Sequence, residues 1–305
     1  MSLQEKEWFM EAPWGRMCIV AWGDCSDPPV LVVHGHLDSA ASFRPLLKLL
    51  PRKFYYIGLE LPGHGKSDPY PPGLMINVLD FVYPIEIVRR HFRWETFVYI
   101  AHSVSTTIGR FYQLAYPNRM SKVVEIDQIW PKTIDPEDFA NWYDKSFTSY
   151  FKRYDHYNMS KEKRPTHTWQ EAIEKLCKNR NLTPETARAT LERFSEPADE
   201  RNHLIRYTFD ERTKLTTRPV LSTKQIKNLY AKITTPTLAV ISKGSIQKGF
   251  YQTIPFLLEE ELENYKVVKV EGHHDVFITN PERMAPCISK FLLTGLDGME
   301  SKSKL

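Results

Sequence analysis

Residues 101–105, with the sequence AHSVS, have the residue types and spacing of a nucleophilic serine. They follow a strand-like run at 96–100 and precede a segment with helical periodicity. A sharp strand-to-helix turn, usually written G-x-S-x-G, lets its central serine project above a sheet and needs small flanking residues. Ala101 and Ser105 replace the two glycines, and both are small enough for the turn. We predict that Ser103 is a nucleophile; the alternative is a buried serine that only caps the helix.

A second candidate element is the loop at 34–38, with the sequence HGHLD, which follows the apolar run VLVV. A loop of this kind can supply backbone N–H groups to the oxyanion that develops when a serine attacks a carbonyl. We predict that the N–H groups of His36 and Val104 form this oxyanion hole. Asp38 borders the expected cleft, where it either positions a substrate or hydrogen-bonds the loops.

The elements that must position these residues alternate between strand and helix. Strand-like runs occupy residues 17–21, 30–33, 54–59, 96–100, 122–126, 237–241 and 266–270. Helical patterns occupy residues 42–50, 75–92, 106–116, 251–263 and 281–293. Such alternation through short loops is typical of a parallel sheet covered by helices on both faces. We therefore predict an α/β fold with a mostly parallel, doubly wound sheet.

The alternation stops at residue 130, and the chain up to residue 230 is charged, aromatic and mostly helix-forming. We interpret 130–230 as a helical cap inserted into a core made of 1–129 and 231–305. Three of its aromatic residues are candidates for lining an apolar substrate pocket: Trp130, Trp142 and Phe147. Packing within the cap itself is the alternative role of these side chains.

Several motifs together resemble those of α/β-hydrolases: the HG loop, LELPGHGKSD at 59–68, AHSVS at 101–105 and GHHDVFITNPE at 272–282. More narrowly, HGHLDSAASFRPLLKLLPRKFYY and LPGHGKSDPYPPG resemble the serine hydrolase-like protein family of animals, some members of which are peroxisomal. The resemblance implies an α/β-hydrolase fold with a serine, an acid and a histidine in that order along the chain.

The resemblance also implies which histidine is the base. Family members place it seven residues before the proline of an NPE-like motif, which is Pro281 here, and this selects His274. The neighbouring His273 falls on a position that is usually small, and a solvated loop histidine is the alternative role for either residue.

The acid departs from the usual position. The turn after the run 237–241, where many α/β-hydrolases carry it, reads SKGSIQK and has no carboxylate. The alternative position known in the superfamily is the end of the run 122–126, which delivers Asp127, 24 residues after Ser103. We predict that Asp127 orients the imidazole and stabilises its cation; the alternative is that it caps the start of the inserted segment.

The predicted function is hydrolysis of a carboxylic ester or thioester through Ser103, His274 and Asp127, by way of an acyl-enzyme and with no metal or organic cofactor. Epoxide hydrolase and dehalogenase chemistry is disfavoured because those enzymes use an aspartate where Ser103 stands. One alternative is a degenerate hydrolase fold that binds a small apolar ligand or a protein partner. Acyl transfer in place of hydrolysis is a further alternative that the residues do not separate.

Composition places limits on partners and location. The 305 residues carry a net charge of only +4, spread along the chain, so a nucleic-acid partner is not indicated. No apolar run approaches the ~18 residues that a membrane span needs. The four cysteines lack the spacing of a zinc site or a disulfide framework. The last three residues, Ser303, Lys304 and Leu305, match the tripeptide read by peroxisomal import receptors, so we predict a peroxisomal location, and a cytoplasmic one otherwise.

Overall fold

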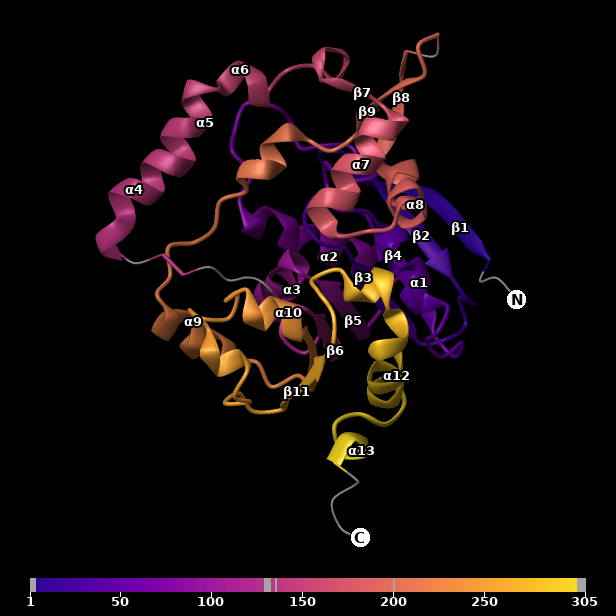
Figure 1. Cartoon of the computed structure of the whole chain (residues 1–305). Helices are drawn as coiled ribbons and strands as arrows, with labels where there is room; N and C mark the ends of the chain where they lie inside the picture. Colours follow the sequence, from indigo (N-terminus) through magenta and orange to yellow (C-terminus); the bar gives the residue numbers. More distant parts are fainter. Residues whose placement is uncertain (1–3, 129–132, 135, 200, 301–305) are drawn as a thin grey trace.

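The computed structural model describes residues 4–128, 133–134, 136–199 and 201–300 (Figure 1). Trp130 and the predicted import tripeptide Ser303, Lys304 and Leu305 lie outside the described residues. Within them, no helix is both long and apolar enough to cross a membrane.

An eight-stranded sheet forms the centre of the molecule, in the order β1-β2-β4-β3-β5-β6-β10-β11. Its strands are β1 (Glu5–Ala12), β2 (Gly15–Trp22), β3 (Pro29–Val33), β4 (Tyr55–Leu59), β5 (Phe97–His102), β6 (Met120–Ile126), β10 (Thr237–Ser242) and β11 (Tyr265–Val270). The β1–β2 and β2–β4 pairs are antiparallel, and the other pairs are parallel. The predicted α/β fold with a mostly parallel sheet is confirmed.

Helices cover both faces of this sheet. They are α1 (Arg44–Leu47), α2 (Val82–His91), α3 (Val104–Ala115), α9 (Thr223–Tyr230), α10 (Lys243–Gln247), α11 (Val276–Thr279), α12 (Ala285–Thr294) and α13 (Asp297–Glu300). Successive strand side chains point to opposite faces. In β10, Val240 packs in a cluster with α12, whereas Ala239 and Ile241 pack in a cluster with α9.

One predicted helix is wrong. Residues 251–263 form turns and a short 3₁₀ helix, Pro255–Leu257, in place of a continuous helix. The apolar side chains that suggested helical periodicity, such as Leu257 and Leu262, are nevertheless buried against α9 and β10. The spacing of these apolar residues therefore reflects their burial in the core and not a helix.

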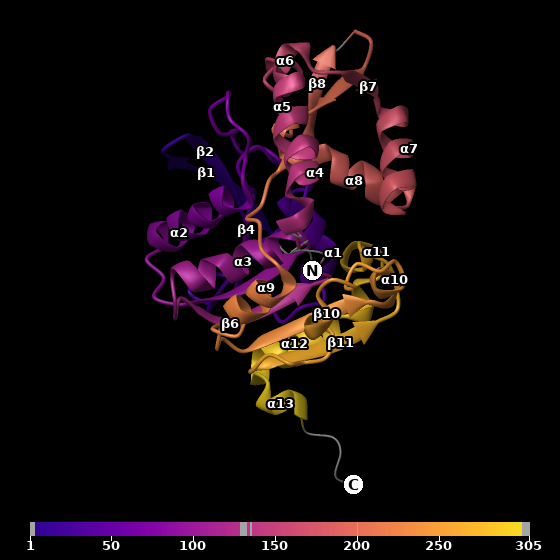
Figure 2. The ribbon, with the colours of Figure 1, turned by 90° about the vertical axis from the view of Figure 1, so that its left-hand side faces the viewer.

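The described residues between β6 and α9, here called the cap segment, stand above the core (Figures 1 and 2). Its helices are α4 (Phe139–Tyr143), α5 (Ser149–Lys152), α6 (Tyr154–Tyr157), α7 (Trp169–Arg180) and α8 (Pro184–Phe194), and one π-helical turn (Asp144–Thr148) links α4 to α5. A small antiparallel sheet, in the order β7-β9-β8, joins them: β7 (Thr166–Thr168), β8 (Ser195–Asp199) and β9 (Leu204–Tyr207). The sequence did not predict these strands, which are short and half-exposed.

Two observations describe where the cap segment meets the core. Ile226 and Tyr230 of α9 pack in a cluster with β10 and Tyr265 of β11, whereas the predicted division placed residues 223–230 in the cap. In addition, Arg193 of α8 reaches down to the core and forms a buried ion pair with Glu60, at 2.6 Å between Nε and Oε1. The cap segment thus contacts the core through this ion pair, and Ala187 of α8 also packs in the apolar cluster of the sheet.

Candidate active site

Ser103 occupies the turn between β5 and α3. Its backbone angles are φ 56° and ψ −124°, a strained combination for a residue other than glycine. Its side chain makes no capping hydrogen bond to the helix, so the alternative role of a simple helix cap has no support here. The residue is 6% exposed. These features are those of a nucleophile turn, in which strain holds the hydroxyl above the sheet.

The two residues that replace the glycines of this turn are both accommodated. Ala101 is fully buried within β5. The hydroxyl of Ser105 donates a hydrogen bond to the carbonyl of His34 and so ties the turn to the loop after β3. In that loop, a Cβ on Gly35 would lie 2.7 Å from His102 Nδ1 and 3.2 Å from Ser103 Cβ. The close approach of loop and turn therefore requires glycine at position 35.

His274 and Asp127 lie in hydrogen-bond contact. The Nδ1–H of His274 donates to Oδ2 of Asp127 at 2.8 Å, which leaves Nε2 as the acceptor of the neutral ring. Asp127 is fully buried, whereas the His274 side chain is 24% exposed. The neighbouring His273 instead contacts Thr279, at 3.4 Å from Nε2 to the hydroxyl oxygen. Of the two candidate histidines, the structure brings only His274 to Asp127.

The turn that lacks a carboxylate supplies hydrogen-bond donors to Asp127. The Ser242 N–H donates to Oδ1 at 2.9 Å, and the hydroxyls of Ser242 and Ser245 donate to Oδ2 at 3.1 and 2.5 Å. Burial raises the pKa of Asp127, but the hydrogen bonds from His274, Ser245 and Ser242 outweigh burial, and the pKa lies below its usual value. The carboxylate is therefore charged and fixed at neutral pH.

Ser103 and His274 line a common cavity of about 870 Å³, here called the Ser103 cavity. Residues from the sheet edge form one wall, and residues of α7, α8 and β9 form the other. The sheet-edge wall includes Asp38, His102 and Asp275. A cavity of this size is in the range that holds small-molecule ligands.

The predicted oxyanion-hole residues lie together. His36 and Val104 line a small pocket of about 60 Å³, and His36 also lines the Ser103 cavity. Val104 is the first residue of α3, where N–H groups have no partner within the helix. The His36 ring donates from Nε2 to the carbonyl of Thr213 at 2.8 Å, which fixes the loop below the cap segment. The two residues thus line one pocket next to the turn of Ser103, and their role as an oxyanion hole stays a prediction.

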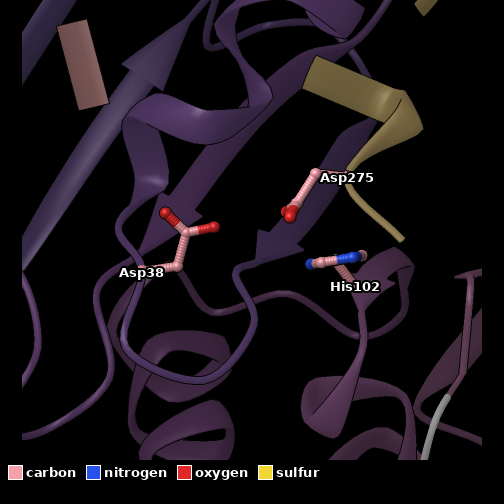
Figure 3. Close-up of side chains that lie close together, drawn as sticks. All are labelled: Asp38, His102 and Asp275. Atoms are coloured by element: carbon pink, nitrogen blue, oxygen red, sulfur yellow. The ribbon is translucent and has the colours of Figure 1, made fainter. Parts of the chain in front are cut away.

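Asp38 pairs with an arginine of the cap segment. Figure 3 shows Asp38, His102 and Asp275 converging on one space, and their ligand atoms lie within 4.8 Å of one another. Arg180, the last residue of α7, enters this cluster: Nη2 lies 2.9 Å from Asp38 Oδ2 and 2.5 Å from Asp275 Oδ1. The guanidinium group thus supplies the positive charge that two adjacent buried carboxylates require.

The charges in this cluster are fixed by burial and pairing. Burial raises the pKa of Asp275, but Arg180 outweighs burial and lowers it to about 2. Burial, with a smaller contribution from His274, lowers the pKa of His102 to about 3. The His102 ring donates from Nε2 to the carbonyl of His274 at 3.0 Å. The neutral ring of His102 therefore supports the backbone of His274.

The predicted aromatic lining is placed elsewhere. Trp142 and Phe147 contact each other, with ring centroids 5.6 Å apart, and neither lines the Ser103 cavity. Packing along α4 and the π-helical turn occupies these rings, which is the alternative role that the sequence left open. The aromatic residues that do line the cavity are Phe194, Tyr207, Phe209 and Phe250. Sequence reasoning missed Tyr207 and Phe209 because they belong to the unpredicted strand β9 and the loop after it.

Comparison with known proteins places this geometry in a family. Residues 28–281 match the family model of the alpha/beta hydrolase fold. The chain belongs to the α/β hydrolase family. The human serine hydrolase-like protein 2 is 27% identical over 300 residues, covering 93% of this chain and 92% of the relative. A probable serine hydrolase of Drosophila melanogaster is 23% identical and covers 94% of this chain and 87% of the relative. The resemblance to animal serine hydrolase-like proteins is thereby confirmed as a distant homology.

Solved structures share the fold of this α/β hydrolase. A hypothetical protein from Pseudomonas aeruginosa superposes with a TM-score of 0.81 at 19% identity, covering 94% of this chain and 99% of that chain. The thioesterase domain from the curacin biosynthetic pathway superposes with a TM-score of 0.72 at 18% identity, covering 93% and 99%. At these identities the likeness concerns the fold alone.

Proposed function

We propose that this α/β hydrolase is a serine hydrolase that cleaves a carboxylic ester or thioester through an acyl-enzyme. The observation that carries the proposal is the contact between His274 Nδ1 and Asp127 Oδ2 in a cavity that Ser103 also lines. The homology to serine hydrolase-like proteins and the strained turn at Ser103 add support.

In the proposed mechanism, Ser103 Oγ attacks the substrate carbonyl while Nε2 of His274 accepts the serine proton. Asp127 stabilises the imidazolium that forms, and its own hydrogen bonds keep it ionised. The N–H groups of His36 and Val104 bind the oxyanion, at roughly 3–4 kcal/mol per donor. His274 then gives the proton to the leaving alkoxide or thiolate, and the C–O or C–S bond breaks. Water, deprotonated by His274, releases the carboxylic acid and restores Ser103.

The test is covalent labelling of the full chain with a fluorophosphonate probe. Wild type should be labelled, and both Ser103→Ala and His274→Ala should abolish labelling. His273→Ala is the matched control, and it should retain labelling because its ring does not contact Asp127. A folded wild type that resists the probe would contradict the proposal. It would favour a fold that binds ligands without turnover. Product analysis with water or an alcohol as acceptor separates hydrolysis from acyl transfer.

A further inference from the structure

The lining of the Ser103 cavity carries an excess of positive charge. Five lining residues are cationic: Lys175, Lys178, Arg180, Lys214 and Lys248. Only two lining residues are carboxylates, Asp38 and Asp275, and both are already paired with Arg180. An anion that enters this cavity therefore meets cations whose charge the lining itself does not neutralise.

Three of these lysines are available to a ligand. Lys214 forms an ion pair with Glu211, at 2.7 Å between Nζ and Oε2. In the described part of the chain, no ion pair is found for Lys175, Lys178 or Lys248. All three are exposed, and Lys175 Nζ lies 5.5 Å from the ring centroid of Tyr207, another residue of the cavity lining. A side chain that keeps its ammonium group in solvent can move it to a ligand at low cost.

The lysines of the Ser103 cavity come from two separate elements of the chain. Lys175 and Lys178 belong to α7, which ends at the Arg180 cluster beside His102. Lys248 follows α10. Its charge, after the larger effect of burial, lowers the pKa of His273, the residue before His274. Lys248 is therefore close to the end of the cavity where His274 would protonate a leaving group.

The same cavity has an apolar part. Its carbon-rich lining consists of Leu37, Leu176, Phe194, Phe209 and Phe250. Lysines on the wall with apolar and aromatic groups between them suit a molecule that has both an apolar body and an anionic group. A neutral lipid ester would leave the ammonium groups unused, whereas a small dianion would leave the aromatic groups unused.

We propose that the substrate is an anionic ester or thioester, which carries a carboxylate or phosphate that Lys175, Lys178 and Lys248 bind. This inference rests on the proposed function, because it names the substrate class of the same site. The negative charge is either on the acyl chain or on the leaving group, and the experiment distinguishes the two. A purely structural role, in which Lys178 stabilises the C-terminus of α7, would alter stability and leave selectivity unchanged.

The experiment compares kcat/KM for matched pairs of substrates. For the acyl side, the pair is 4-nitrophenyl butyrate and the 4-nitrophenyl monoester of succinic acid. For the leaving-group side, the pair is butyryl-coenzyme A and the butyryl thioester of N-acetylcysteamine. Wild type should prefer the anionic member of at least one pair by about 10-fold or more, since a few unscreened charges in a cleft supply that much. The pair that shows the preference identifies the source of the charge.

The variant Lys175→Gln/Lys178→Gln/Lys248→Gln should lower this preference ratio by about 10-fold. Raising the salt concentration from 50 to 500 mM should lower the wild-type ratio in the same direction, because screening shortens the reach of the charges. Lys152→Gln is the matched control, since Lys152 is an exposed lysine of α5 that does not line the cavity. Its ratio should equal that of wild type.

A wild-type ratio near one in both pairs, or a ratio that the triple variant leaves unchanged, would overturn the inference. Calorimetric binding of glutarate and of coenzyme A gives a readout that needs no turnover. At least one of them should bind wild type about 10-fold more tightly than the triple variant. Equal binding would overturn the inference even if Ser103 is reactive. If wild type is not labelled by the probe but still binds glutarate or coenzyme A more tightly than the triple variant, only the proposed function is overturned.

Discussion

The wall of the Ser103 cavity that belongs to the sheet and the wall that belongs to the cap segment are attached in different ways. On the sheet side, main-chain hydrogen bonds continue past the strand ends: Ser103 N–H donates to Ile126 at 3.0 Å, and Asp127 N–H donates to Val240 at 2.8 Å. On the cap side, α7 and α8 contact the core through side chains. Arg180 and Arg193 form ion pairs with it, and Ile173 and Ala187 pack in its apolar cluster. The proposed reacting groups are thus positioned by the backbone, and α7 and α8 by side-chain contacts.

Under the proposed function, this difference separates the reacting groups from the groups that select the substrate. A backbone ladder fixes its residues within tenths of an ångström at little entropic cost, as a catalytic constellation requires. Side-chain contacts allow α7 and α8 to be replaced or moved without disturbing the backbone hydrogen bonds of the sheet side. We expect substitutions on the sheet side to change turnover and substitutions on the cap side to change stability or substrate preference.

The largest expected effect is on the sheet side. Asp127→Asn should lower kcat by about 10⁴-fold, because an amide neither selects the reactive tautomer of His274 nor stabilises its cation. Steady-state hydrolysis of an activated ester measures this loss. The free energy of unfolding, from urea denaturation, serves as the control for a merely misfolded protein. An Asp127→Asn variant with near wild-type turnover would show that the acid lies elsewhere.

On the cap side, Arg180→Met should lower the free energy of unfolding by about 3 kcal/mol, since it leaves Asp38 and Asp275 buried without their counter-charge. Urea denaturation of wild type and Arg180→Met measures this difference in the free energy of unfolding. Fluorophosphonate labelling of Ser103 should persist in the folded fraction, because the sheet-side contacts are intact. If Arg180→Met abolished labelling and left stability unchanged, the distinction between the two walls would be wrong.

The same ion pair predicts a dependence on pH. The pKa of Asp275 in the folded state is about 2, below the value near 3.9 in an unfolded chain. Its contribution to stability is therefore present above about pH 4 and lost as the pH falls toward 2. Urea denaturation between pH 5 and 2.5 should show a steeper loss of stability for wild type than for Arg180→Met.

The smallest expected effect tests which hydrogen bonds hold Asp127 on the sheet side. Ser245→Ala removes one hydrogen bond to Asp127 and should lower kcat about 10-fold with little change in KM, in line with a charge-assisted hydrogen bond. Tyr251→Phe is the matched control, since its hydroxyl lies 3.5 Å from Asp127 Oδ1 and contributes little. Equal losses in the two variants would mean that Asp127 is held by packing and not by these donors.

The sheet side was more predictable from the sequence than the cap side. Most strands of the central sheet and the turn at Ser103 were predictable from short local motifs, and the resemblance to α/β-hydrolases indicated His274 and Asp127. The partner of Asp38 was not, because Arg180 lies 142 residues away and nothing local distinguishes it from other surface-type arginines. Likewise, the aromatic, helix-forming composition of the inserted segment marked Trp142 and Phe147 without deciding between a pocket lining and packing on each other.

The hydroxyl of Ser105 has a consequence for protein engineering. A consensus approach would install glycine at this position, to match the usual G-x-S-x-G pattern. That change would take a donor from the His34 carbonyl, at a cost of about 1–3 kcal/mol, and would place glycine in the first turn of α3, at up to about 1 kcal/mol more. Ser105 and the loop at 34–36 therefore act as one structural unit. Grafting the Ser103 turn onto another scaffold requires both.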